Sequence, residues 1–239
     1  MNLVNLNEKT VFISGATGGI GRAISKKFAQ IGCNLFLTSS CESELKELSN
    51  SLMSQKVRVE YHAANLNSKD DIYSLIDITR KKFKCIDILI NSAGVFPNLS
   101  LADTSDEDFL ETIDVNFRSI FLFSRAFSKE MVFNRWGRIV NIGSSSAYSG
   151  FKETSLYCAS KHAVLGFSKS IHEELKEFNV RTYCISPSST KSKMGLKTKG
   201  QDYSTFLDPK EIADYVVFSI SFDSNLVSNE IFLKRMLTK

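Results

Sequence analysis

The sequence lacks the cysteine patterns of a zinc site or a disulfide framework. Its five cysteines, at positions 33, 41, 85, 158 and 184, include no CxxC pair and follow no regular spacing. Zinc sites and small disulfide-bonded domains both depend on such spacings. We therefore predict reduced thiols in a reducing compartment, and no metal site.

Long apolar runs and an N-terminal targeting signal are missing as well. The chain begins MNLVNLNEKT, without a basic region followed by an apolar stretch, so no signal peptide is visible. The longest apolar stretches fall well short of the roughly 20 residues that cross a membrane. These absences predict a cytoplasmic protein without a membrane span.

The charge is not extreme in either direction. A net charge of +4, from 30 Lys and Arg against 26 Asp and Glu, is spread along the chain. It forms no basic cluster strong enough to indicate nucleic acid, and we expect no such partner. With 43% apolar and 23% charged residues and no internal repeat or linker, the 239 residues predict one globular domain over 1–239.

What the chain does have is a regular alternation of short apolar runs with helical patterns. Most of the runs are continuous, as in parallel strands that are covered on both faces. The alternation predicts an α/β fold, a Rossmann-like doubly wound parallel sheet of about seven strands with helices on both faces. The predicted strands are 10–14, 34–38, 57–63, 86–90, 138–142, 180–185 and 230–233, and the predicted helices are 19–31, 42–54, 68–83, 106–133, 155–178 and 209–221.

Helix-end signals support three of these boundaries. Gly32 suits the position after the first helix, where a left-handed backbone is common. Ser105 with Asp108 has the spacing of a capping box before the helix 106–133. Asp208-Pro209 offers a capping side chain and then a proline in the first turn of the last helix.

A glycine-rich turn follows the first predicted strand. The residues from Ser14 to Gly21 read SGATGGIG and lead directly into a helix. Backbone N–H groups in such a turn can approach a diphosphate closely, and the helix dipole adds attraction. A tight turn alone can carry two glycines, so the pattern is weak by itself. Its place at the start of a βαβ unit favours dinucleotide binding.

The end of the second strand is expected to face the adenosine ribose. An acidic residue there favours NAD, and a nearby arginine favours NADP. This chain has Thr38-Ser39-Ser40, which carries neither charge but offers hydroxyl donors. We predict NADP(H) in preference to NAD(H), with Ser39 and Ser40 at this end of the cofactor.

Tyr157 and Lys161 are four residues apart in the stretch SLYCASK, with only small residues between them. Residues at i and i+4 lie on the same face of a helix. An ammonium about 4 Å from a phenol contributes roughly the 4 kcal/mol that lowers a tyrosine pKa from 10 to about 7. The pair therefore predicts a proton donor and acceptor, although the same spacing also occurs by chance on helices.

A serine cluster, Gly143-Ser144-Ser145-Ser146, follows the strand RIVNI at the end where open α/β sheets bind ligands. Together with the glycine-rich turn and the Tyr157–Lys161 pair, this serine cluster completes a set of motifs found in one known family. The chain resembles the short-chain dehydrogenase/reductase family in its single-domain form of roughly 250 residues. The motifs stand in family order: GATGGIG (15–21), NSAG (91–94), DVNF (114–117), RIVNIGS (138–144), YCASK (157–161) and ISP (185–187).

The resemblance implies a role for each matching position. Tyr157 is the expected acid/base, Lys161 lowers its pKa and holds the nicotinamide ribose, and Ser144 orients the substrate oxygen. Asn116 is expected to anchor a water that links Lys161 to solvent. The expected cofactor-binding residues are Gly15, Thr17, Gly18, Gly19, Ile20, Gly21, Ser39, Ser40, Asn65, Leu66, Asn91, Ala93, Gly94, Tyr157, Lys161, Pro187, Thr190 and Ser192.

The sequence departs from the family pattern in four places. Ser92 and Ser188 replace an asparagine and a glycine, and Gly18 replaces a basic residue that is common in NADP-dependent members. The C-terminus also lacks the usual glycine pair. The serine at 188 puts the local geometry of the nicotinamide segment in question.

The expected partners are a small carbonyl or alcohol substrate and further copies of the chain. The segment 190–199, TKSKMGLKTK, carries four lysines, which is typical of a solvated loop but also compatible with an acidic substrate. The helical stretches 117–127 and 157–169 are apolar around much of their circumference. Together with the family resemblance, they predict a homodimer or homotetramer.

The family resemblance predicts an oxidoreductase that transfers a hydride between the nicotinamide cofactor and a ketone or secondary alcohol, as 3-oxoacyl reductases of the family do. A sugar-nucleotide epimerase or dehydratase would use the same Tyr–Lys pair, but these usually carry a longer C-terminal substrate region. A dinucleotide-sensing protein without turnover is the alternative outside enzymes. The identity of the substrate and the direction of the reaction are not encoded in any motif.

Overall fold

Each strand predicted from the apolar runs is present in the computed structural model, which describes residues 3–198 and 200–237. The strands form one parallel seven-stranded sheet in the order β3-β2-β1-β4-β5-β6-β7. Their bounds are Thr10–Ser14 (β1), Asn34–Ser39 (β2), Val59–Ala63 (β3), Ile88–Asn91 (β4), Gly137–Ile142 (β5), Val180–Pro187 (β6) and Glu230–Leu233 (β7). The predicted doubly wound α/β fold is confirmed.

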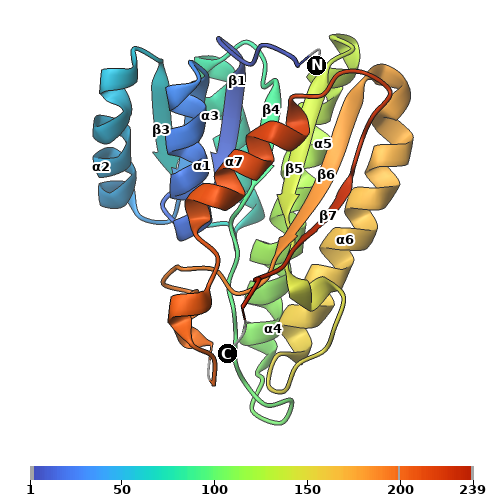
Figure 1. The fold of residues 1–239 in the computed structure, drawn as a ribbon. Coiled ribbons are helices and arrows are strands. Elements are labelled where there is room, and N and C mark those ends of the chain that lie inside the picture. Colours follow the sequence, from blue (N-terminus) through green and yellow to red (C-terminus); the bar gives the residue numbers. More distant parts are fainter. Residues whose placement is uncertain (1–2, 199, 238–239) are drawn as a thin grey trace.

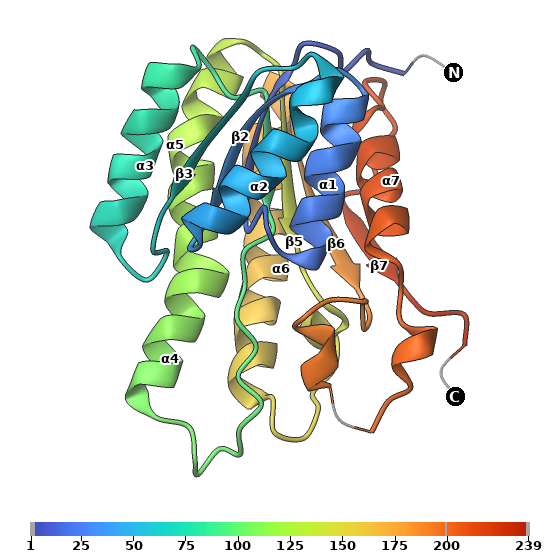
Figure 2. The same ribbon diagram turned by 90° about the vertical axis from the view of Figure 1, so that its left-hand side faces the viewer.

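Helices cover both faces of the sheet (Figures 1 and 2). On one face lie α1 (Gly19–Gln30), α2 (Glu42–Leu52) and α7 (Pro209–Ile220), and on the other lie α3 (Lys69–Lys82), α4 (Asp106–Ile113), α5 (Ser119–Phe133) and α6 (Ser155–Leu175). Val11 and Ile13 of β1 join the core beneath the first group, whereas Phe12 joins the core beneath the second. Because both sides of β1 are buried, its sequence is a continuous apolar run.

The predicted helix ends are confirmed in detail. The Ser105 hydroxyl accepts a hydrogen bond from the Asp108 N–H, and the Asp108 carboxylate accepts one from the Ser105 N–H. Asp208 caps α7 through the N–H of Lys210, with Pro209 in the first turn. Gly32 follows α1 with a φ of 86°, in the left-handed region that glycine adopts most easily.

The structure corrects four of the predicted elements. The predicted helix 106–133 contains a π-helical segment, Asp114–Arg118, between α4 and α5. Strands β3 and β4 begin two residues later than predicted, at Val59 and Ile88. The predicted helix 155–178 ends at Leu175 and continues as a 3-10 turn over Lys176–Phe178. In the part of the chain that the structure describes, there is no helix with the length and apolar character of a membrane span.

The order of the strands determines where a ligand can bind. The chain turns outward in opposite directions from β1 and β4, which pair with each other in register, Val11 opposite Ile88. The loops after β4, β5 and β6 gather at the carboxyl end of the sheet, toward the lower part of Figure 1. Ligand sites in open α/β sheets form at such a switch point.

Candidate active site

The glycine-rich turn after β1 leaves no room for side chains. Gly15 has a φ of 65°, and a Cβ built on it would lie 2.6 Å from the Cα of Ala93 in the loop after β4. A Cβ on Gly21 would lie 2.1 Å from the carbonyl oxygen of Gly15. The turn therefore packs backbone against backbone, which leaves its surface open to a diphosphate.

A cavity of about 1360 Å³ extends from this turn over the ends of β4, β5 and β6. It exceeds the roughly 300–1,000 Å³ that drug-sized ligands occupy, so it has room for a dinucleotide beside a small substrate. Nearly all of the predicted site residues line it: Gly15, Thr17, Gly18, Gly19, Ile20, Gly21, Ser39, Ser40, Asn65, Leu66, Ala93, Gly94, Ser144, Tyr157, Lys161, Pro187, Thr190 and Ser192.

Asn91 and Asn116 lie behind the cavity wall rather than in it. The Asn91 amide, 1% exposed, donates to the side chain of Asn141 in β5 at 2.7 Å. The Asn116 side chain bonds both the N–H and the C=O of Val95, and its amide nitrogen donates to the Ser160 hydroxyl at 3.1 Å. Asn116 therefore joins the loop after β4 to α6, and the π-helical segment brings it into place.

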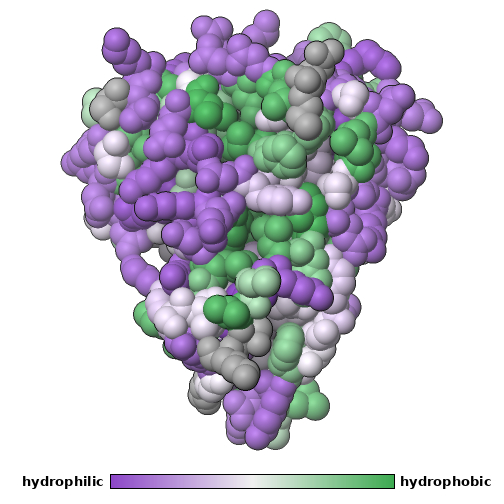
Figure 3. All heavy atoms as spheres, viewed as in Figure 1, coloured by the Kyte–Doolittle hydropathy of each residue, from purple (hydrophilic) through white to green (hydrophobic). Residues whose placement is uncertain are grey.

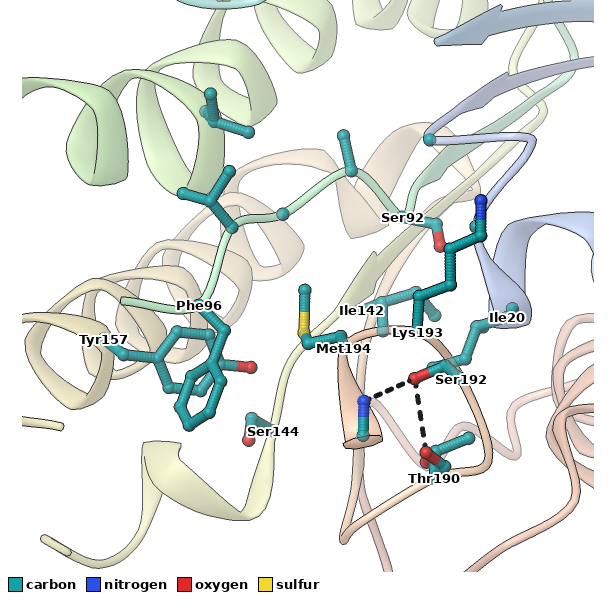
Figure 4. A pocket seen from close by; sticks show the side chains of 18 of the residues that line it. Ile20, Ser92, Phe96, Ile142, Ser144, Tyr157, Thr190, Ser192, Lys193 and Met194 are labelled. Atoms are coloured by element: carbon teal, nitrogen blue, oxygen red, sulfur yellow. Dashed lines mark hydrogen bonds between the residues drawn. The ribbon is translucent and has the colours of Figure 1, made fainter. Parts of the chain in front are cut away.

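Tyr157 and Ser144 face each other at one end of the cavity (Figure 4). Both are largely buried, at 8% and 9% exposed. Burial raises the pKa of Tyr157 to about 12, and a hydrogen bond with Ser144 acts in the opposite direction. The ring of Phe96 packs on Tyr157 edge to face with centroids 4.8 Å apart. The phenol is thus a fixed, protonated group that points into the cavity.

Lys161 lies on the same face of α6 but not against the phenolic oxygen. Its Nζ is 5.7 Å from the centre of the Tyr157 ring and donates to the carbonyl oxygen of Ile142 at 2.9 Å. Burial lowers the pKa of Lys161 to about 8. Burial is the largest influence on the pKa of the phenol in this structure, and the lowering of that pKa by Lys161 stays a prediction.

Charged and hydroxyl-bearing residues lie at the other end of the cavity, which we name the adenosine corner: Thr17, Arg22, Ser40, Glu44 and Lys193. The residues after the second strand predict no cation here, and the structure corrects that. Arg22 comes from α1 and Lys193 from the segment between β6 and α7, and they pair with Glu47 and Glu44 of α2. The hydroxyl of Ser39 is engaged with the backbone of Cys41 in the turn after β2.

The serine that replaces a family glycine at position 188 fits its place. Its backbone is not among those with positive φ, so the side chain causes no strain there. Its N–H donates to the carbonyl of Leu233, and its hydroxyl accepts from the N–H of Arg235. The departure at Ser188 thus joins the end of β6 to the C-terminal segment.

The lysines of the segment 190–199 differ in their surroundings in the structure. Lys193 contacts Glu44 rather than the Tyr157 end, whereas Lys191 and Lys197 are exposed. Lys199 lies outside the described residues. Sequence reasoning missed Phe96 and Met194, which line the cavity near Tyr157. They stand in irregular segments, where no periodicity indicates the direction of a side chain.

Comparison with known proteins agrees with this geometry. The family model for short chain dehydrogenases matches residues 9–202. The chain belongs to the short-chain dehydrogenase/reductase family. A 3-oxoacyl-[acyl-carrier-protein] reductase, FabG, of Rickettsia felis is 31% identical over 95% of each chain. An uncharacterized oxidoreductase of Staphylococcus saprophyticus is 30% identical over 97% of this chain and 99% of its own.

Two solved structures superpose on nearly the whole fold. A metagenomic short-chain oxidoreductase in complex with NADP has a TM-score of 0.86 and 25% identity, over 98% of this chain and 100% of that one. An alcohol dehydrogenase of the archaeon Thermococcus sibiricus, complexed with 5-hydroxy-NADP, has a TM-score of 0.88 over 96% of this chain and 97% of that one. At 23% identity the second likeness concerns the fold alone.

Proposed function

We propose that this protein is an NADP(H)-dependent oxidoreductase that interconverts a carbonyl compound and a secondary alcohol. One observation carries the proposal: a protonated phenol, a serine hydroxyl and a glycine cradle open into the same cavity. Tyr157 can give a proton to an oxygen, and Ser144 can donate a hydrogen bond to that oxygen while charge develops on it.

The residues present fit a nicotinamide dinucleotide. Gly15, Gly19 and Gly21 would hold the diphosphate, because side chains there would collide with neighbouring residues and disrupt the turn that presents its N–H groups. The adenosine part would contact Asn65, Leu66 and Ala93, with the backbone of Asn91 behind them. The nicotinamide part would be held by Lys161, Pro187 and Thr190. When bound, the cofactor supplies hydride transfer at C4 of its nicotinamide ring.

Tyr157 acts as an acid in this proposal. A phenol with a pKa of about 12 is protonated at neutral pH, and it is therefore ready to give its proton during reduction of a carbonyl. As the proton leaves, negative charge grows on the phenolic oxygen. The ammonium of Lys161, whose Nζ lies 5.7 Å from the centre of the ring, stabilises that charge by about 3 kcal/mol at an effective dielectric near 20.

The pH dependence follows from Lys161. Its amine is charged below a pKa of about 8 and neutral above it. We expect kcat/KM for carbonyl reduction to be flat below pH 8 and to fall about tenfold per unit above it, measured over a pH series. Lys161→Arg keeps its charge throughout, so its residual activity will show no break near pH 8. A break in both proteins would assign the fall to another group.

The reaction is tested by titrating the purified protein with NADPH and NADH and then adding a panel of ketones and 3-oxoacyl thioesters. Nicotinamide absorbance is followed over time. Oxidation of NADPH by at least one carbonyl compound is expected. If the cofactor binds and no compound in the panel oxidises it, the dinucleotide-sensing alternative is favoured.

The cavity supports a small carbonyl substrate with an apolar part. Phe96, Phe151 and Met194 line it near Tyr157. Lys152 also lines the cavity on that side and is the side chain there that an acidic substrate would meet. A cytoplasmic location and the absence of nucleic-acid partners stay predictions.

We also propose that the protein is a homodimer or homotetramer. The rings of Phe117 in the π-helical segment and Phe121 of α5 contact Phe167 of α6 at centroid distances of 5.7 and 6.1 Å, and Phe121 is 38% exposed. A second apolar area lies over α7 and β7 (Figure 3), where Phe218 is 49% exposed. Both are faces that a second copy can cover.

A negative charge introduced on the face that forms the subunit interface is expected to dissociate the oligomer. Phe121→Asp would bury a carboxylate in an α5–α6 interface, so we expect its mass by light scattering to fall to that of a smaller species at equal concentration. Phe218→Asp is the matched variant on α7. A wild type that runs as a monomer, or two variants with unchanged mass, would reject the proposal.

A further inference from the structure

The segment between β6 and α7 lies directly on the glycine turn. We call residues 190–195 the strap. A Cβ built on Gly19 would be 2.8 Å from the Cβ of Ser192 and 3.2 Å from the carbonyl oxygen of Lys191. Within the strap the Ser192 hydroxyl donates to the Thr190 carbonyl and accepts from the Gly195 N–H (Figure 4). The backbone of the strap is thus held in place above the turn.

From this position Lys193 reaches the adenosine corner. Its Nζ lies 2.9 Å from a carboxylate oxygen of Glu44 in the first turn of α2. Hydrogen bonds from Lys193 and Thr17 lower the pKa of Glu44, so this carboxylate is ionised at neutral pH. Glu44 follows β2 by a few residues and lines the cavity together with Thr17 and Ser40.

The pair has opposite consequences for the two cofactors. An ionised carboxylate accepts a hydrogen bond from a ribose 2′-hydroxyl and repels a 2′-phosphate. A lysine ammonium attracts a 2′-phosphate far more strongly than it attracts a neutral 2′-hydroxyl. Because Lys193 is 92% exposed, water screens its attraction to Glu44, and a phosphate dianion competes well for it.

We propose that Lys193 is the residue that selects NADP(H), by exchanging its contact with Glu44 for the 2′-phosphate. The inference rests on the proposed function, since it concerns the cofactor of that same site. Arg22, which pairs with Glu47 at 3.3 Å, is a second cation of the adenosine corner. Glu44 keeps a residual affinity for NAD(H), because it can accept from a 2′-hydroxyl once Lys193 is withdrawn.

Direct binding tests this without any turnover. Calorimetric titration of Lys193→Gln with NADPH is expected to show a Kd raised about tenfold or more, because a charge-assisted hydrogen bond is lost. The Kd for NADH is expected to stay the same or to fall, since no such bond is lost there and Glu44 is freed to accept from the 2′-hydroxyl. Glu44→Gln is expected to change the ratio of the two Kd values in the opposite direction, because NADPH binds more tightly once the carboxylate that repels its 2′-phosphate is removed. The effect of Lys193→Gln shrinks as salt is raised.

Lys191→Gln is the matched control, because it removes the same charge from the same strap two residues away. It is expected to leave the ratio of the two Kd values unchanged. Equal weakening of both cofactors by Lys193→Gln would mean that Lys193 only fastens the strap, and it would overturn the inference, as would an unchanged ratio. A wild type that binds neither cofactor would overturn the proposed function itself.

Discussion

Replacement of Tyr157 by phenylalanine is expected to lower kcat by about a thousandfold, because the general acid of the reaction is lost. The affinity for the cofactor is expected to stay within about twofold of wild type, since the change removes one oxygen from a group that serves proton transfer. The measurements are steady-state rates with a confirmed carbonyl substrate and a calorimetric titration with NADPH.

Phenylalanine preserves the surroundings of the ring. The packing of residue 157 against Phe96 survives, because that contact is made by ring atoms alone. A melting temperature equal to that of wild type is the control for folding. Should Tyr157→Phe keep a kcat near the wild-type value, the phenol is not the acid and the proposed mechanism is wrong.

The second large effect is expected at the glycine turn. In Gly21→Ala the new methyl group would stand 2.1 Å from the carbonyl oxygen of Gly15 and 3.1 Å from the Cα of Ala16. Both are backbone atoms, so the turn itself must move. We expect a loss of about 3 kcal/mol in the free energy of unfolding, a melting temperature about 10 °C lower, and no cofactor binding that calorimetry can detect.

Gly166→Ala provides the comparison within the same chain. Gly166 lies within α6, and a Cβ there meets nothing within 4 Å. Alanine is the better helix former, so this variant is expected to gain about 0.5–1 kcal/mol in the free energy of unfolding. If thermal melts show Gly21→Ala to be as stable as Gly166→Ala, with intact cofactor affinity, the cradle is not the rigid element described above.

Local patterns in the sequence were sufficient for the fold. The buried strands are continuous apolar runs, and the capping residues Ser105 and Asp208 act on neighbours a few positions away. Such features depend on nearby residues, so sequence reasoning can find them. The π-helical segment at Asp114–Arg118 was missed because one extra residue in a turn barely disturbs an apolar periodicity.

The site could be predicted only in part, for a physical reason. The glycine turn and the Tyr157–Lys161 pair are each made of residues close together in the sequence. Both line the cavity as expected. The charges of the adenosine corner come from distant segments, with 149 positions between Glu44 and Lys193. The pKa of Tyr157 depends on how deeply the fold buries it, which helical spacing does not determine.

The pairing of β1 with β4 also determines when the cradle can form during synthesis. The backbone of Gly15 rests on that of Ala93, which belongs to the segment after β4. A nascent chain that has only its first three strands outside the ribosome has made the glycine turn but not the surface that supports it. For the proposed nucleotide site, we therefore expect nucleotide to give no help in folding the first three strands and to stabilise the chain only after the segment that follows β4 has emerged.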